Sequence, residues 1–448
     1  MDMKNTLDAI EKIYENYDRY GRDLNAFITI RDQNDVMSEY KHKSGGPLSG
    51  VPYVLKDAYV TEGIETTSAS DVLKGFIPPY SATVYRKMQE AGAILIGKMN
   101  MDAWGHGGST ENTDYGPAKN PWDVTRVSGG SSGGPAVAIA ANLAECAIGE
   151  DTGGSIRNPA AWTNTTGLKV TYGRVSRYGA IAYASSFDTV GPMARTAEDC
   201  AAILSTIAGA DPYDATSALQ PVDDYVGRLN DSLKGRTIGI PTEMYGKGLD
   251  LEISNTIYAT KAIWEKLGVK IVDVSLPIAD IGLAAYYLIA PSETSSNLSR
   301  YDGIRYGNGR DKFTDETMRR IMIGTYALSA GYYDAYYRQA QKVRTLMVQA
   351  YEKALSRCDV ILMPVNPMMP PKFGQLMSDP LTNFLADIYT TSINPVGIPA
   401  LALPAGFSKD SLPIGMQLVG QKFSEALLLA LGHQYQQQTD WHTRSPKL

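Results

Sequence analysis

The first residues of the chain alternate apolar and charged positions at the spacing of an amphipathic helix. Leu7, Ile10, Ile13 and Tyr14 follow one another at helical intervals, so they would line one face. The sequence therefore predicts a helical N-terminal segment over residues 1–45.

Short apolar runs alternate with helical stretches along much of the chain. Residues 51–60 form a β-rich run that contains Lys56, and residues 81–102 read as a helix, Gly92 and a strand at Ile94–Ile96. Four further strands are expected, at residues 236–245, 269–277, 359–365 and 400–406. Alternation of helices and strands predicts an α/β architecture around a large twisted sheet.

Residues 135–149 are almost entirely apolar and begin with Pro135, a residue favoured in the first turn of a helix. A helix that is apolar on all sides lies inside a large domain, so this segment is predicted to be a buried helix. Neither a Pro-, Gly- or Ser-rich linker nor an internal repeat divides the sequence. A single domain over residues 1–448 is expected.

Composition excludes several classes of protein. The 448 residues are 44% hydrophobic and 20% charged with a net charge of −6, which is typical of a soluble globular chain and gives no basic surface for independent nucleic-acid binding. Three dispersed cysteines suggest neither a disulfide framework nor a zinc site. The N-terminus lacks a signal-peptide pattern, and no apolar run reaches the roughly 18 residues of a membrane span. A reducing, cytoplasmic setting is expected.

Two glycine-bracketed serine loops are the candidate chemistry. Residues 128–134 read SGGSSGG and contain Ser131, and residues 150–158 read EDTGGSIRN and contain Ser155. The first loop matches the G-x-S-x-G nucleophile elbow, but that motif needs a preceding strand and a later histidine. Residues 120–128 are polar and turn-like, and only His433 and His442 follow. No Gly-Lys-Ser/Thr supports a phosphate loop, and flexible loops without chemistry are the remaining alternative.

A lysine can replace histidine as the base only when it is neutral. Its pKa must then fall from about 10.4 towards 7, and a drop of roughly three units corresponds to about 4 kcal/mol. Burial can supply that difference. Lys56 is the candidate because Val54 and Leu55 precede it, although an isolated lysine at a strand end is usually solvated.

Lys56 in a V-x-K-D run, followed by GGSSGG and then DTGGSIR, resembles the amidase signature family. The resemblance implies one α/β domain with a mixed sheet, helices on both faces and a catalytic core over residues 46–200, followed by the rest of the sheet and the substrate pocket over residues 201–448. It implies a Ser-cisSer-Lys triad in which Ser155 is the nucleophile, Ser131 the bridging serine and Lys56 the base. The implied oxyanion donors are the backbone N–H groups of Thr152, Gly153, Gly154 and Ser155.

Four longer stretches resemble one branch of that family, the glutaminase subunits of tRNA-dependent amidotransferases. They are residues 100–121, 295–307, 319–346 and 379–401. By this resemblance Tyr287, Arg320 and Asp387 would bind glutamine, although the segment before Arg320 is shorter than is usual. Asp151 and Arg157 are expected to hold the Ser155 loop by an ion pair or hydrogen bonds.

The same resemblance implies a set of partners. Ammonia released from glutamine would amidate Glu-tRNA(Gln), with Asp-tRNA(Asn) as the open alternative, on a B subunit, and a small C subunit would complete a heterotrimer. ATP and magnesium would belong to the B subunit; no cofactor or metal is expected on this chain, and no membrane contact. The tyrosine-rich residues 326–337 would either pack inside or face a partner.

Two other functions stay open. A free-standing amidase acting on small, peptide or fatty amides would use the same triad. A catalytically silent scaffold is the third alternative, against which the intact Lys56, Ser131 and Ser155 argue.

Overall fold

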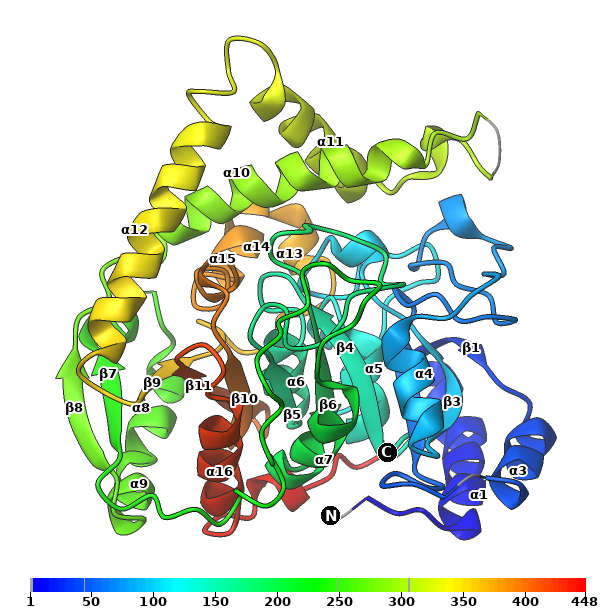
Figure 1. Cartoon of the computed structure of the whole chain (residues 1–448), viewed down its shortest axis with the longest axis horizontal. Helices are drawn as coiled ribbons and strands as arrows, with labels where there is room; N and C mark the ends of the chain where they lie inside the picture. The colour runs from blue at the N-terminus through cyan, green and yellow to red at the C-terminus, as the bar shows by residue number, and fades with distance from the viewer. Residues whose placement is uncertain (1–2, 44, 247, 305–306) are drawn as a thin grey trace.

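The described strands form one sheet that runs through the whole molecule (Figure 1). The computed structural model describes residues 3–43, 45–246, 248–304 and 307–448, without the side chains of residues 279, 280, 380, 381 and 383. The eleven strands are ordered β1-β3-β2-β4-β6-β5-β10-β11-β9-β7-β8 and mix parallel with antiparallel pairs. They are β1 (Phe27–Ile30), β2 (Pro52–Lys56), β3 (Ile94–Met99), β4 (Cys146–Asp151), β5 (Thr166–Lys169), β6 (Thr189–Ala194), β7 (Thr237–Pro241), β8 (Lys270–Val274), β9 (Val360–Pro364), β10 (Ala400–Phe407) and β11 (Pro413–Gly420).

Helices cover both faces of this sheet because its strands are apolar on both sides. Along β4, Cys146 and Ile148 belong to one buried cluster and Ala147 to another, as the alternation of side chains along a strand requires. Helices α5 and α6 pack with the strands in the second cluster, and α7 and α16 with those in the first. The predicted α/β domain with a mixed sheet is confirmed, as are the strands at residues 94–96, 236–245, 269–277, 359–365 and 400–406.

The helices differ widely in length. They are α1 (Leu7–Asn16), α2 (Arg22–Leu24), α3 (Gln33–Lys41), α4 (Thr83–Glu90), α5 (Gly133–Ala140), α6 (Arg157–Thr163), α7 (Ala197–Ile207), α8 (Leu251–Ala259), α9 (Lys261–Lys266), α10 (Ala279–Asn297), α11 (Asp315–Leu328), α12 (Tyr337–Leu355), α13 (Gln375–Ser378), α14 (Pro380–Ala386), α15 (Ile393–Val396) and α16 (Glu425–Gln436). No helix among the described residues is long and apolar enough to cross a bilayer.

The predicted helix over residues 135–149 is wrong in its second half. Helix α5 ends at Ala140, and residues 146–149 belong to β4. Asn142 adopts a left-handed conformation, φ 54°, which a helix cannot continue. The final residues, Cys146 to Gly149, are buried between β2 and β6, and an apolar run that is buried on both faces looks the same in a helix and in a strand.

The N-terminal segment is also not uniformly helical. Residues 27–30 form β1, which pairs antiparallel with β3 at the edge of the sheet. Asn25 ends α2 in a left-handed conformation, φ 52°, and its side-chain amide donates hydrogen bonds to the carbonyl oxygens of Tyr115 and Gly116. These contacts connect residues about 90 positions apart, so local periodicity could not reveal them.

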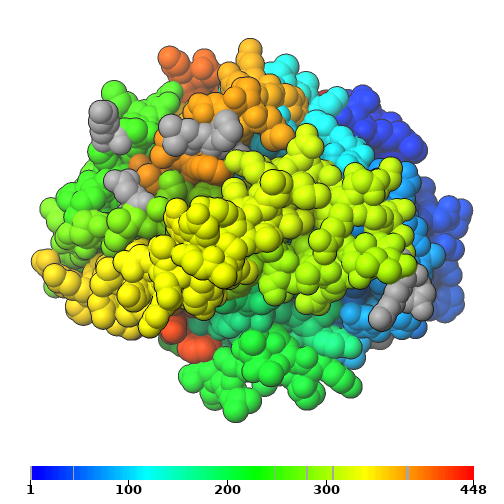
Figure 2. Space-filling view, turned by 90° about the horizontal axis from the view of Figure 1, so that it is seen from above, coloured from blue at the N-terminus to red at the C-terminus, as the bar shows by residue number. Residues whose placement is uncertain are grey.

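Helices α10, α11 and α12 lie across one end of the sheet, and Figure 2 shows them spread over that face of the molecule. Helix α11 crosses α10 very closely. A Cβ added at Gly324 would lie 1.9 Å from the carbonyl oxygen of Pro291, so only glycine permits this approach. In the tyrosine-rich segment that runs from the last turn of α11 to the start of α12, Tyr326, Tyr332 and Tyr336 are exposed. These three rings therefore face outwards.

Candidate active site

The candidate residues meet where two parallel strands end. Lys56 is the last residue of β2 and Asp151 the last of β4, and these strands are parallel neighbours. Their carboxyl ends therefore share one edge of the sheet. Ser131 lies immediately before α5, and Ser155 lies in the turn between β4 and α6. Residues 120–128 contain turns and isolated bridges rather than a strand, so the strand–turn–helix context belongs to Ser155 and not to Ser131.

Lys56 and Ser131 are in direct contact. Lys56 Nζ lies 2.8 Å from Ser131 Oγ, and both side chains are buried. The peptide bond between Gly130 and Ser131 is cis. Burial lowers the pKa of Lys56, and nearby carboxylates, Glu150 first, oppose that shift. A lysine in this environment is suited to accept a proton from the serine hydroxyl.

The loop that carries Ser155 leaves no room for larger side chains. A Cβ at Gly153 would lie 2.4 Å from the hydroxyl of Tyr286, and one at Gly154, where φ is 131°, would lie 2.4 Å from Thr390 Oγ1. Ser155 itself is 8% exposed, so its hydroxyl can be approached only through a narrow opening. The Gly154 N–H already donates to Asp151 Oδ1 at 2.9 Å, so an oxyanion bound there would compete with that carboxylate.

Asp151 and Arg157 hold this loop by a buried ion pair, as expected. Arg157 donates to both carboxylate oxygens of Asp151 at 3.0 Å, and neither side chain is exposed. Burial alone would raise the pKa of Asp151, but the Arg157 charge and its hydrogen bonds hold that pKa below its usual range. Arg157 also donates to the carbonyl oxygen of Thr390 and to Asn394 Oδ1, which fastens the loop to the segment before α15.

The three residues expected to bind substrate come from α10, α11 and the turn after α14. The Tyr287 hydroxyl donates to Asp387 Oδ2 at 3.0 Å, and the Arg320 guanidinium lies 5.6 Å from the Tyr287 ring centre. Burial raises the pKa of Asp387 to about 6, although Tyr287 and Arg320 act in the opposite direction. The structure thus brings together the Arg320 guanidinium and the Asp387 carboxyl group. The first can pair with the carboxylate of a zwitterionic ligand and the second with its ammonium group.

Glu316 and Tyr183 position Arg320, and sequence reasoning missed both. Arg320 Nε donates to Glu316 Oε1 at 2.7 Å, and another guanidinium nitrogen donates to the Tyr183 hydroxyl. Glu316 lies four residues before Arg320 on α11, so i,i+4 spacing was an available signal. Tyr183 lies far from Arg320 in the sequence, so no sequence pattern indicated their contact.

The buried His106 near the site contacts two threonine hydroxyls through its ring nitrogens. His106 Nδ1 lies 3.1 Å from Thr317 Oγ1, and His106 Nε2 lies 3.1 Å from Thr294 Oγ1. Burial lowers the pKa of this histidine, with Arg320 acting in the same direction. Both ring nitrogens are thus engaged with threonines. Within the described part of the chain no group of three or more His, Cys, Asp or Glu side chains is arranged to hold a metal ion.

Comparison with known proteins decides the family. The sequence profile described as Amidase matches residues 8–429. The chain belongs to the amidase family. The A subunit of glutamyl-tRNA(Gln) amidotransferase from Marinomonas sp. (strain MWYL1) is 49% identical over 95% of this chain and 92% of its own length. The protein of the same name from Pseudomonas aeruginosa is 49% identical over 94% and 92%.

Two solved structures extend this likeness to other amidases. The A subunit of glutamyl-tRNA(Gln) amidotransferase from Thermotoga maritima is 38% identical over 94% of this chain and 89% of its own, with a TM-score of 0.82. The substrate complex of 6-aminohexanoate cyclic dimer hydrolase is 26% identical over 98% and 95%, with a TM-score of 0.89. The fold is therefore shared by amidases with different substrates, and the substrate has to be inferred from the pocket.

Three further carboxyl groups of this amidase surround Lys56, and the sequence patterns did not single them out. Glu150 Oε2 lies 3.5 Å from Lys56 Nζ, and Glu150 and Asp188 are both buried. Burial and, after it, the neighbouring Glu150 raise the pKa of Asp188 to about 8. Asp102 is buried as well, and burial raises its pKa to about 7. An acidic residue at the end of an apolar strand, as Glu150 is, was the one signal available.

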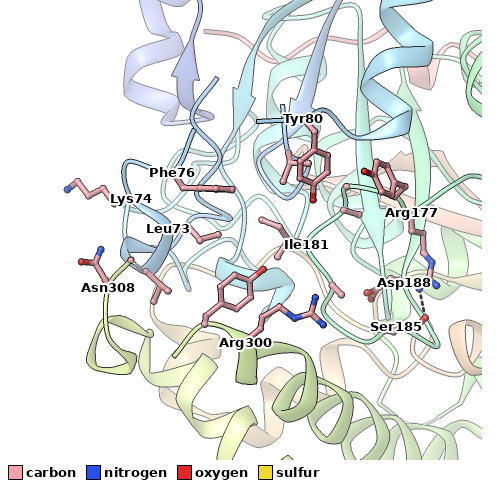
Figure 3. Close-up of a pocket in the computed structure, with 18 of the residues that line it drawn as sticks. Leu73, Lys74, Phe76, Tyr80, Arg177, Ile181, Ser185, Asp188, Arg300 and Asn308 are labelled. Carbon is pink, nitrogen blue, oxygen red and sulfur yellow. Dashed lines mark hydrogen bonds between the residues drawn. The ribbon is translucent and has the colours of Figure 1, made fainter. Parts of the chain in front are cut away.

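Asp188 also lines a cavity of about 770 Å³ on the other side of this cluster. Figure 3 shows Arg177, Ser185 and Asp188 at one end of the cavity and Leu73, Lys74 and Phe76 at the other. Asp188 Oδ1 accepts a hydrogen bond from Thr152 Oγ1 at 2.7 Å. One carboxyl group therefore connects the cavity to the loop that carries Ser155.

Proposed function

We propose that this amidase is the glutamine-hydrolysing subunit of a tRNA-dependent amidotransferase, since its relatives are named as A subunits of glutamyl-tRNA(Gln) amidotransferase. The buried contact between Lys56 and Ser131 carries the proposal, because it places a neutralisable base beside a serine in a chain 49% identical to A subunits. Glutamine is the substrate that Arg320 and Asp387 favour, since a free amino acid presents both a carboxylate and an ammonium group.

In the proposed reaction Ser155 Oγ attacks the side-chain amide carbon of glutamine. The Ser155 proton passes to Ser131, whose own proton passes to Lys56 Nζ, so an ammonium group and an oxyanion form together. Lys56 returns the proton through Ser131 to the amide nitrogen, and ammonia leaves as the C–N bond breaks. Water then hydrolyses the glutamyl ester by the same proton route.

Backbone N–H groups of Thr152, Gly153 and Ser155 are the proposed oxyanion donors, since the Gly154 N–H is engaged with Asp151. Donors fixed before the reaction stabilise the developing charge without reorganising, and mutational losses for one such donor run to about 10²–10³ in rate. The buried Asp151–Arg157 pair supports this role because it restrains the loop at both ends.

Substrate orientation is assigned to three side chains. Arg320 would pair with the α-carboxylate, and Asp387 with the α-ammonium group, while Tyr287 holds Asp387 in place by its hydrogen bond. A guanidinium group suits a carboxylate because its planar fork can donate two parallel hydrogen bonds.

The acceptor reaction belongs to partner subunits in this proposal. A B subunit would bind ATP, magnesium and Glu-tRNA(Gln), or Asp-tRNA(Asn), and a C subunit would complete a heterotrimer. The net charge of −6 supports leaving phosphate recognition to another chain. A cytoplasmic site of action follows from a role in translation.

Ammonia release from glutamine, measured for the chain alone and with candidate B and C subunits, ATP and mischarged tRNA, tests the proposal. We expect stable co-purification with the partners and faster release when all components are present. A free-standing amidase is the second candidate, because 6-aminohexanoate cyclic dimer hydrolase has the same fold, with a TM-score of 0.89 at 26% identity. Full activity of the isolated chain on simple amides, without stimulation by partners, would support that candidate instead.

A further inference from the structure

Glu150 is buried beside Lys56, yet the proposed reaction gives it no role. Its side chain is 3% exposed, and Oε2 lies 3.5 Å from Lys56 Nζ. Its other oxygen, Oε1, has no hydrogen-bond partner among the residues that the structure describes. A buried carboxyl group with an unpartnered oxygen is destabilising, so stability alone does not account for this residue.

We propose that Glu150 is a positioning residue of the amidase reaction, whose carboxylate stabilises the ammonium form that Lys56 adopts when it takes the serine proton. The inference rests on the proposed function, because it assumes that Lys56 acts as the base. Glu150 would not touch the substrate. It would act through Lys56, as a carboxylate acts through the histidine of a Ser-His-Asp triad.

The physical need for such a group follows from where Lys56 lies. A lysine that is neutral at rest must carry a positive charge in the transition state, inside a site from which water is excluded. An unpaired ammonium group there is strongly disfavoured. A carboxylate at 3.5 Å offsets that cost at the moment the proton arrives.

Charge coupling points the same way. Burial lowers the pKa of Lys56, and Glu150 is the strongest of the opposing influences. Burial raises the pKa of Glu150, and Lys56 is the strongest influence that lowers it. Each group therefore favours the charged form of the other. The remaining titratable groups that face Glu150 are Tyr59, Asp151, Arg177 and Asp188.

Backbone contacts fix the geometry of the pair. Lys56 Nζ lies 3.4 Å from the carbonyl oxygen of Glu150, and the same oxygen accepts a hydrogen bond from Ser132 Oγ at 3.2 Å. Ser132 is the neighbour of Ser131. The backbone around Glu150 is thus tied both to the base and to the bridging loop, which keeps the carboxyl group aligned with Lys56 Nζ.

The test is the pH dependence of kcat for ammonia release by Glu150→Gln, measured with the partner subunits and with saturating glutamine, so that the pH dependence of glutamine binding does not enter. Glutamine keeps the shape of the side chain and removes its charge. Because the carboxylate raises the pKa of Lys56, its removal lowers that pKa, and the acid limb moves to lower pH. We expect a shift of about one unit or more, with the rate on the plateau falling at least about tenfold.

Two further variants separate this role from a structural one. Glu150→Asp keeps the charge and is expected to recover part of the plateau rate and most of the acid limb. Glu145→Gln is the matched control, because Glu145 lies just before the same strand but faces Lys4 and Arg195 rather than Lys56. It should leave the profile unchanged.

An unshifted acid limb in active Glu150→Gln overturns the inference, and so does a uniform loss at every pH. Should Glu150→Gln not fold, Glu150→Met replaces it, and failure of both to fold means a structural role and also overturns the inference. If the wild-type complex releases no ammonia from glutamine, the proposed function fails first, so the two failures are distinguishable.

Discussion

Three buried lysines of this amidase differ in what their nitrogens touch. Lys98 Nζ pairs with Asp57 Oδ1 at 2.9 Å, and Lys169 Nζ donates to the carbonyl oxygens of Val170 and Ile398. Burial lowers the pKa of all three lysines. A shifted pKa therefore does not identify the base. We assign the role of base to Lys56 because its nitrogen contacts a serine hydroxyl beside the Ser155 loop.

Replacing any one residue of the proposed triad should remove nearly all of the activity, because the three residues act together. Ser155→Ala is expected to abolish ammonia release, and Lys56→Ala or Ser131→Ala to cost nearly as much, because such residues are strongly non-additive and losses of roughly 10⁶ occur in other serine hydrolases. Ser205→Ala is the control and should keep the activity, since the Ser205 hydroxyl lies on α7 and donates to the carbonyl oxygen of Ala201. Covalent labelling of Ser131 by a glutamine-like electrophile, with Ser155 unmodified, would contradict the assignment.

Asp387 should make glutamine use sensitive to mild acid. Its pKa of about 6 means that the carboxylate is lost as pH falls through that value, and the ammonium group of glutamine then has no counter-charge. We expect KM for glutamine to rise below about pH 6. Asp387→Asn should weaken the binding of glutamine by about 2–5 kcal/mol at neutral pH. Its activity towards a small uncharged amide should change little. Equal losses on both substrates would mean that Asp387 is structural.

Motif order and resemblance predicted residues that the structure brings close together, such as Lys56 and Ser131, but not the side chains that support them. Lys56, Ser131 and Ser155 each lie in a recognisable sequence pattern. Glu150 was overlooked because an acidic residue next to Asp151 looks like part of an exposed loop. Tyr183 reaches Arg320 from 137 positions away, and such a contact exists only after the chain has folded.

At the level of elements, the turn from β4 to α6 determines the position of the nucleophile. Two N–H groups of the turn, those of Gly154 and Ile156, donate to the Asp151 carboxylate, and Arg157 closes the loop from the helix side. The ion pair thus acts as the restraint of the whole strand–turn–helix unit.

Breaking that ion pair should cost far more than breaking one on the surface. Asp151→Asn leaves a buried guanidinium unpaired and is expected to lower the free energy of unfolding by about 3–5 kcal/mol in urea titrations. Asp18→Asn, which removes an exposed i,i+4 partner of Arg22, should leave the free energy of unfolding nearly unchanged. Because the pKa of Asp151 is held low, its contribution is present above the unfolded value of about 4 and is lost as pH falls. Similar losses in both variants would refute the role of the buried pair.

Sequence periodicity predicted the elements whose pattern is local. The strands near residues 240, 272, 362 and 403 are bounded by clear turn signals, and each is present. Periodicity gave the wrong element at residues 146–149, because burial on both faces removes the alternation of apolar and polar residues. It was also wrong at residues 27–30, where pairing with β3 overrides a helical pattern. The structure determines these segments by tertiary contacts rather than by local preference.

At the scale of the whole molecule, one continuous sheet connects every region of the site. Cys146, Cys200 and Cys358 all belong to the same large buried cluster, in which Cys358 lies near β9. Burial raises the pKa of all three thiols. Buried cysteines of this kind are unreactive until the structure opens.

Thiol labelling should therefore report global unfolding. We expect an aromatic disulfide reagent to leave the native protein unmodified and to label all three cysteines in denaturant, at a midpoint that coincides with loss of far-ultraviolet circular dichroism. Glutamine bound to the native state should move both midpoints upwards together. Early labelling of Cys358 alone would show instead that the β7–β9 end of the sheet opens independently.

The crossing of α11 over α10 at Gly324 links the two halves of substrate recognition. Tyr287, which holds Asp387, lies on α10, and Arg320 lies on α11, one turn from Gly324. Because backbone meets backbone at the crossing, neither helix can shift without displacing the other. Arg320 and Asp387, the proposed partners of the two charged ends of an amino acid, are therefore held at a fixed distance from each other. Moving one helix alone would therefore not make room for a longer or shorter substrate, and we expect a change of specificity to require substitution of the side chains that line the pocket.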